Sequence, residues 1–101
     1  MNVYIKTKYT DGEVELKFGY YSNGSIAIKG YSTDGLHECV FIATVALSTI
    51  PAPGFVFLKG WSENEGLPEA LVKAGIVELT GKKIPTGYCE AQEAKLLVDI
   101  K

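Results

Sequence analysis

The stretch GWSENEGLPEALVKAG, residues 60–75, decides the fold, because it is the only part of the chain that reads as a helix. Within it Leu67, Leu71 and Ala74 fall on one face at helical spacing. A helix of about seven to ten residues is marginal in water by itself. We therefore expect its aliphatic face to pack on a sheet, where burial of each large side chain contributes about 1.5–3 kcal/mol.

Two residues set the expected ends of this helix. Pro68 suits the first helical position, where an amide hydrogen would have no partner inside the helix. Gly75 suits the left-handed cap that follows a last turn. We predict a first turn over residues 63–66 and the helix itself over residues 68–74.

The residues before the helix allow two interpretations. Ser62 and Glu65 have the spacing of a capping box, acids near a helix N-terminus are favourable, and Trp61 would pack this end of the helix against the core. On this interpretation the stretch is structural. On the other, Trp61 and Asn64 line a binding surface, because Trp is enriched in binding hot spots.

The rest of the chain is typical of short strands separated by turns. EVELKFGY, residues 13–20, alternates apolar and polar side chains with a period of two. Asp11-Gly12, Asn23-Gly24 and Asp34-Gly35 are turn signals, as a series of hairpins requires. The expected strands cover residues 3–9, 13–20, 25–31, 39–47, 55–59, 76–79, 88–90 and 95–100, with loops over 48–54 and 80–87.

These elements predict one α+β domain over residues 1–101, an antiparallel meander sheet of five to seven strands with one short helix packed on one face. The segment 40–47 is apolar on both of its faces. Such a strand is central in a sheet, or a second layer covers it. Because one short helix covers little, we expect a homodimer in which this strand is covered by a second copy.

Composition argues against some classes of function. The chain has 101 residues and a net charge of −2, and all ten of its basic residues are Lys. A nucleic-acid interface is therefore unlikely, since it needs a basic field and favours Arg for reading guanine. No apolar run reaches the roughly 20 residues of a membrane span. The first residues lack the pattern of a secretory signal. We expect a cytoplasmic protein of the host cell with Cys39 and Cys89 as reduced thiols.

The sequence offers little to a catalytic or metal centre. His37 and Cys39 would share one face of a strand, but residues two apart lie about 6.5–7 Å apart, which is long for proton transfer. One His and two distant Cys do not supply the four ligands of a zinc site. We expect no catalytic residues, no metal and no cofactor, and a protein that is not an enzyme.

The segment TGKKIPTG, residues 80–87, offers a different chemistry. Its amides, its hydroxyls and the ammonium groups of Lys82 and Lys83 could face an anion, although the sequence lacks a full phosphate-loop pattern. Thr86 and Tyr88 lie at its end. The alternative is a solvated hairpin loop with no ligand.

Several of these motifs resemble a family of small proteins, of uncharacterised function, carried by phages and conjugative elements. The likeness rests on WSENEG-LPEALVKAGIV and TGKKIPTGYCEA and covers roughly residues 22–90. The family supplies no established activity. The resemblance implies a mobile-element setting, in which small acidic proteins often counter host defence.

The resulting hypothesis is a small non-enzymatic accessory protein. It would bind a host protein or sequester a small, nucleotide-like signal molecule. The alternative is a structural or assembly homodimer with no ligand. The expected partner- or ligand-binding residues are Trp61, Asn64, Glu65, Lys82, Lys83, Thr86 and Tyr88.

Overall fold

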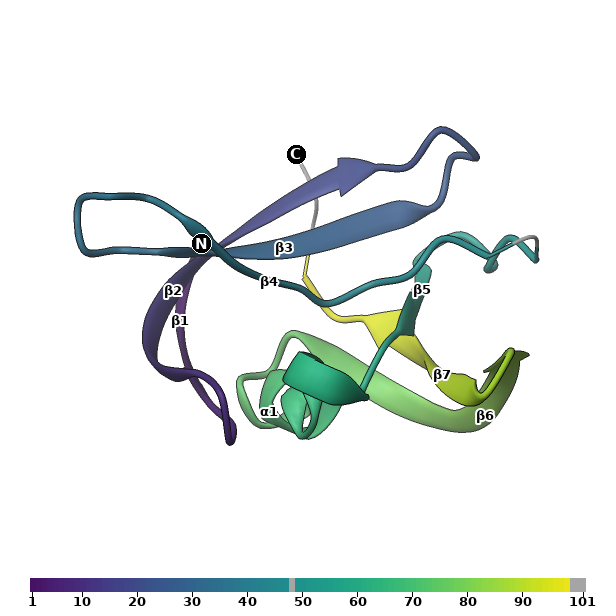
Figure 1. The fold of residues 1–101 in the computed structure, drawn as a ribbon. Helices are drawn as coiled ribbons and strands as arrows, with labels where there is room; N and C mark the ends of the chain where they lie inside the picture. Colours follow the sequence, from purple (N-terminus) through teal and green to yellow (C-terminus); the bar gives the residue numbers. More distant parts are fainter. Residues whose placement is uncertain (48, 99–101) are drawn as a thin grey trace.

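The computed structural model describes residues 1–47 and 49–98, which form seven strands and one short α-helix (Figure 1). The elements are β1 (Asn2–Lys6), β2 (Asp11–Tyr20), β3 (Ile26–Ser32), β4 (Cys39–Ile42), β5 (Phe55–Leu58), the 3₁₀ turn η1 (Ser62–Asn64), α1 (Leu67–Lys73), β6 (Val77–Thr86) and β7 (Cys89–Leu96). The expected mixture of antiparallel strands with one short helix is confirmed.

The strands form two sheets instead of one meander. The first sheet has the order β1-β2-β3-β4 and is a meander, as predicted. The second has the order β5-β7-β6, so β5 pairs with the last strand and not with the next one. The reason is that α1 stands between β5 and β6. The hairpin of β6 and β7 then returns β7 to the side of β5.

A short segment after β4 joins the two sheets. The amide of Ala43 donates to Ile28 O in β3 at 2.8 Å, and the carbonyl of Ala43 accepts from Lys59 N at 3.0 Å. Val45 N donates to Phe57 O in β5, also at 3.0 Å. The seven strands therefore form one curled surface, with β1 at one free edge and β6 at the other.

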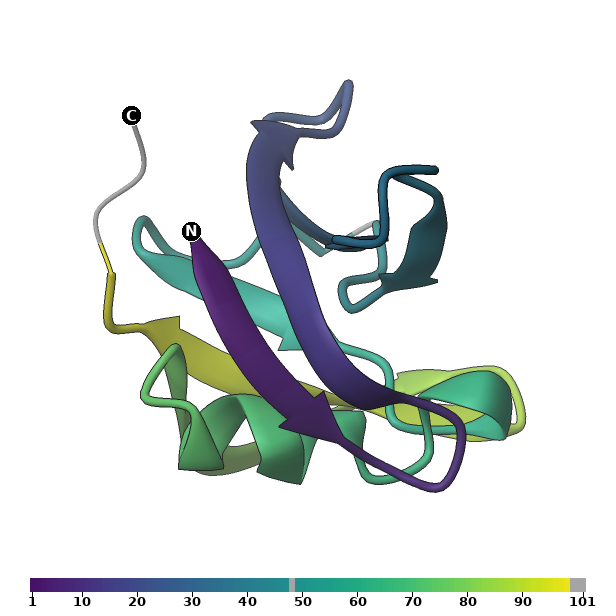
Figure 2. The same ribbon diagram turned by 90° about the vertical axis from the view of Figure 1, so that its left-hand side faces the viewer.

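The helix α1 lies between those two free edges, in contact with both β1 and β6 (Figures 1 and 2). It thus packs on the seam of the curled surface and not on the middle of a single sheet face. The core fills the space between the sheets and α1. Its buried residues are Ile5, Val14, Leu16, Ile28, Phe41, Ala43, Val56, Leu58, Leu67, Leu71, Ile76, Val77 and Ala94.

The ends of α1 agree with the sequence prediction to within one residue. Pro68 is buried in the first turn, and Gly75 has a positive φ of 79°. Ile76 N donates to Leu71 O and Gly75 N to Val72 O, both at 3.0 Å. This pair of bonds is the Schellman arrangement, which requires a left-handed residue at Gly75.

The predicted capping box at Ser62 and Glu65 is wrong. Neither η1 nor α1 has a side-chain cap, and Ser62 itself adopts a left-handed φ of 54°. The reason is that Gly66, with φ of 81°, separates the 3₁₀ turn from α1. The helix proper begins at Leu67, out of reach of the Ser62 hydroxyl.

The predicted loop over residues 80–87 is also wrong, since β6 runs through it to Thr86. The pairing with β7 shifts register between Leu79 and Lys83 and then resumes as far as Thr86 opposite Cys89. Pro85 is tolerated because β6 is an edge strand. The two separate strands expected over 88–90 and 95–100 are replaced by the continuous strand β7, which begins at Cys89 and ends at Leu96; residues 99 and 100 lie outside the described residues.

The apolar segment 40–47 does not form one continuous central strand. Only β4 is a regular strand, the last of the first sheet, and residues 43–45 continue from it as the short segment that joins the two sheets. Phe41 is buried, whereas Val40 is 40% exposed and Ile42 37% exposed. A Cβ atom on Gly30 would lie 2.3 Å from Phe41 Cζ, so the absent side chain of Gly30 makes room for the ring. In the loop that follows, residue 48 lies outside the described residues.

Candidate functional site

A hollow beside the start of α1 brings together residues from three parts of the chain. We call it the Trp61 cavity, and its volume is about 290 Å³. It lies between the segment before η1, the first turn of α1 and the β6–β7 hairpin. Its lining residues are Gly60, Trp61, Pro68, Glu69, Lys83, Cys89, Glu90 and Gln92.

The fold positions these residues by close backbone approach and by strand register. A Cβ atom on Gly60 would lie 3.1 Å from Pro68 Cγ, so a glycine here lets the chain pass against the helix. Lys83 and Gln92 are opposite each other in the ladder of β6 and β7. Glu90 is two residues before Gln92 on β7, so both side chains lie on one face of the strand.

The cavity has a distinct chemical character. Trp61 is half-buried and supplies an aromatic surface. Glu69 and Glu90 supply two carboxylates, against the single ammonium group of Lys83. The excess of negative charge favours a ligand that carries a cation or several hydrogen-bond donors. A cation can also lie over the face of an indole ring.

Of the seven expected binding residues, the structure places Trp61 and Lys83 together in this cavity. Glu65 and Lys82 are exposed outside it, and Tyr88 is exposed at the turn between β6 and β7. Thr86 is half-buried and donates to Cys89 O at 3.3 Å. These four residues therefore do not share one hollow with Trp61.

Asn64 is a correction to the expected surface, because its side chain is only 1% exposed. Its amide nitrogen donates to Ile42 O at 2.7 Å and to Lys59 O at 3.2 Å. These bonds attach η1 to the ends of β4 and β5. Asn64 is thus a structural residue, placed inward by the 3₁₀ turn.

The sequence interpretation missed Glu69, Glu90 and Gln92. In the sequence, Glu69 indicates only a favourable charge at the helix start. The other two lie in β7, which the alternation of residues does not identify as one strand. The signal that could have found them is Gly87, which has φ of 79° and allows a tight turn. A hairpin centred there places residues 89–92 opposite residues 83–86, with Gln92 opposite Lys83.

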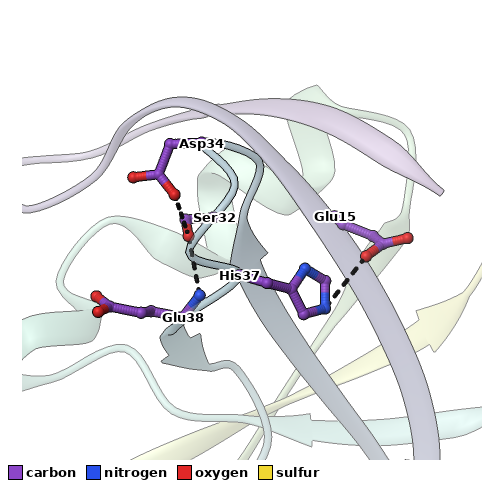
Figure 3. Close-up of polar contacts among 5 residues, drawn as sticks. All are labelled: Glu15, Ser32, Asp34, His37 and Glu38. Atoms are coloured by element: carbon purple, nitrogen blue, oxygen red, sulfur yellow. Dashed lines mark hydrogen bonds and ion pairs between the residues drawn. The ribbon is translucent and has the colours of Figure 1, made fainter.

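A second polar group surrounds the β3–β4 loop on the outer side of the first sheet (Figure 3). Ser32 Oγ donates to Asp34 Oδ1 at 3.0 Å and accepts from Glu38 N at 2.9 Å. Leu36 N donates to Asp34 Oδ1 at 3.1 Å. The backbone amide of Leu36, followed by the Ser32 hydroxyl, holds the pKa of Asp34 below its ordinary value. These bonds close the loop on itself.

His37 belongs to this loop and has a positive φ of 54°. Its ring stacks on Tyr31 with centroids 4.9 Å apart. Its Nε2 lies 3.6 Å from Glu15 Oε1, and Figure 3 shows this contact. Cys39 Sγ instead lies 3.5 Å from Phe41 O. Among the described residues, no hydrogen bond joins the His37 ring to Cys39. His37 and Cys39 therefore do not make the contact between base and nucleophile that covalent catalysis uses.

No protein-family model matches this chain, and neither curated proteins nor solved structures give a match.

The described residues were also compared with the requirements of a metal site and of a membrane-spanning helix. The described residues contain no group of three or more His, Cys, Asp or Glu side chains that could hold a metal ion. Cys39 and Cys89 are both free thiols. In this part of the chain, no helix combines the length and apolar character needed to cross a bilayer.

Proposed function

We propose that the protein is a small non-enzymatic accessory protein of a phage or mobile element that binds a host protein, with the Trp61 cavity as its recognition site. The observation that carries this proposal is the convergence of Trp61, two carboxylates and Gln92 in one hollow. In the mobile-element setting, such binding would serve to counter a host defence.

The chemistry of the cavity favours a basic side chain of the partner. A Lys or Arg side chain would place its charge over Trp61 and between Glu69 and Glu90. Cation–π contacts contribute about 0.5–2 kcal/mol, and hydrogen bonds to charged groups contribute about 1.5–3 kcal/mol. Trp is also typical of the few residues that dominate binding energy at interfaces.

The test is a pull-down from host lysate with matched variants. Glu90→Lys reverses a charge inside the cavity, whereas Glu65→Lys makes the same change at an exposed position outside it. We expect the wild type and Glu65→Lys to retain one stoichiometric partner and Glu90→Lys to lose it. A partner retained equally by both variants would place recognition elsewhere. A lysate that yields no partner would contradict the proposed function.

The second candidate is sequestration of a small nucleotide-like molecule, which the adjacency of Trp61 and Lys83 favours. A base would stack on the indole and a phosphate would pair with the ammonium group. A ligand at 100 times its Kd stabilises the folded state by about 2.7 kcal/mol. A nucleotide panel would therefore raise the Tm of the wild type and not that of Lys83→Glu. A panel that leaves the wild-type Tm unchanged argues against this candidate.

The third candidate is an assembly role as a homodimer. It rests on the exposed apolar side chains of Val40 and Ile42 on the edge strand β4. Light scattering at tens of micromolar would then give about twice the 11.0 kDa mass of the chain, and Ile42→Lys would restore the monomer. A wild-type mass of 11.0 kDa would remove this candidate.

A further inference from the structure

The geometry points to a second binding site, separate from the Trp61 cavity: a groove along the free edge of β1 that accepts an extended acidic peptide as an added strand. We call it the edge groove. Its volume is about 490 Å³, and its lining residues are Val3, Tyr4, Lys6, Ala70, Lys73 and Ala74. They come from β1 and from α1 alone.

The backbone of β1 is unpaired along one side. The strand pairs with β2 on its other side, and the described residues place no strand beyond it. In an antiparallel pair, alternate residues bond to the partner. Because Met1 O accepts from Leu16 N at 2.7 Å, the odd-numbered residues bond to β2. Asn2, Tyr4 and Lys6 therefore turn their backbone N–H and C=O groups toward the free side.

The helix α1 forms the wall opposite this edge. Ala70 of α1 and Ala74, the C-cap residue of the helix, are one helical turn apart, and both are half-buried. Their short side chains leave open the space that larger residues would fill. A strand laid along β1 would therefore place alternate side chains against an apolar floor formed by Val3, Ala70 and Ala74. When a peptide adds to a sheet as a strand, its main-chain hydrogen bonds provide affinity, and the contacts of every second side chain provide specificity.

The charge of the groove is positive. Lys6 and Lys73 flank it, and no acidic side chain is among its lining residues, although the chain as a whole has a net charge of −2. Asp11 lies close by, but it accepts a hydrogen bond from the Tyr4 hydroxyl. The two ammonium groups thus complement a peptide whose side chains alternate between apolar and acidic.

The probe is a terminally blocked peptide of about seven alternating Glu and Val residues, which matches a typical strand length. We expect saturable binding by fluorescence anisotropy and protection of the Tyr4 and Lys6 amides from hydrogen exchange. A matched peptide of alternating Lys and Val should not bind. Affinity should also fall with added salt, because exposed charges are screened.

Two N-methylated versions of the acidic peptide separate strand addition from side-chain binding. One is methylated at odd residues and the other at even residues, so that each loses the amide donors along one of its edges. Strand addition predicts that only one version keeps its affinity. Equal affinities of the two versions, or amides of Tyr4 and Lys6 that remain unprotected, would overturn the proposal. Binding of decanoate in preference to the peptide would also overturn it.

Variants place the peptide in the groove. Lys6→Glu and Lys73→Glu should each weaken binding by about tenfold or more, whereas Lys82→Glu, an exposed change outside the groove, should not. Glu90→Lys should also leave peptide binding intact, because Glu90 lines only the other site. The two proposals can therefore fail independently. Unchanged affinity of both groove variants would refute this one.

Discussion

Asn64 shows how a motif residue that invites a functional interpretation can instead hold the fold together. Its amide nitrogen satisfies two carbonyl groups, those of Ile42 and Lys59, at the point where η1 meets β4 and β5. A buried carbonyl that loses its donor carries the cost of its desolvation. The conformation of the turn, which the letters S-E-N-E do not reveal, decides that this side chain lies inward.

Replacing Asn64 with Ala should lower the free energy of unfolding by about 1–3 kcal/mol, because both carbonyl groups lose their partner. Urea denaturation provides the measurement. Glu65→Ala, one residue further along and exposed, is the control and should stay within about 0.5 kcal/mol of wild type. Equal stabilities of the two variants would show that the two bonds contribute nothing.

Gly30 offers a second test at the scale of one residue. A methyl group there would overlap the ring of Phe41, so Gly30→Ala should destabilise by about 1–3 kcal/mol through overpacking. A methyl group on Gly19, in the neighbouring strand β2, would meet no atom within 4 Å. Gly19→Ala should therefore have little effect. Comparing the Tm values of Gly30→Ala and Gly19→Ala separates the effect of steric overlap with Phe41 from the effect of replacing a glycine in a strand.

Asp34 links stability to pH. Its pKa is lowered in the folded state, chiefly by the amide of Leu36 and then by Ser32. The stabilisation is therefore fully present above the ordinary carboxyl pKa and is lost as pH falls through the lowered folded value. An NMR titration of the Asp34 carboxyl carbon should show the lowered pKa. Asp34→Asn should reduce the acid dependence of unfolding, and an unaltered acid dependence would contradict this account.

At the scale of elements, α1 is the part most open to prediction from sequence. Pro68 and Gly75 mark its ends by steric rules that act locally. By contrast, the full length of β6 escapes prediction because Gly81 and Pro85 are typical of loops. Their acceptance in a strand depends on β6 lying at a sheet edge with a register shift. The edge position and the register shift depend on how β6 pairs with β7, and the sequence of residues 77–86 alone does not reveal them.

The stability of α1 should depend on one buried residue. Leu71 is 0% exposed, and Leu71→Ala should cost about 2–5 kcal/mol by opening a cavity. Val72, the next residue, is 40% exposed and provides the matched control. Val72→Ala should be nearly neutral in urea unfolding. A Leu71→Ala cost no larger than that of Val72→Ala would mean that the helix does not depend on its packing.

At the scale of the whole molecule, the sequence predicts the class of fold but not the division into two sheets. Alternation identifies strands of the first sheet such as β2, but it does not identify strand partners when a helix intervenes, as between β5 and β6. The candidate site is limited in the same way. Local chemistry identifies Trp61 and Lys83, whereas Glu90 and Gln92 require knowledge of which strand lies opposite β6.

The position of α1 against β1 has a consequence for synthesis on the ribosome. About sixty residues separate Lys6 from Leu67. At about 5–20 residues per second, the nascent chain carries its first strand without the helix for roughly 3–12 s. During that interval the inner side of β1, including Ile5, has no helical cover. Chaperones that bind emerging apolar segments would cover this strand during that interval, and their release would follow translation of residues 67–73.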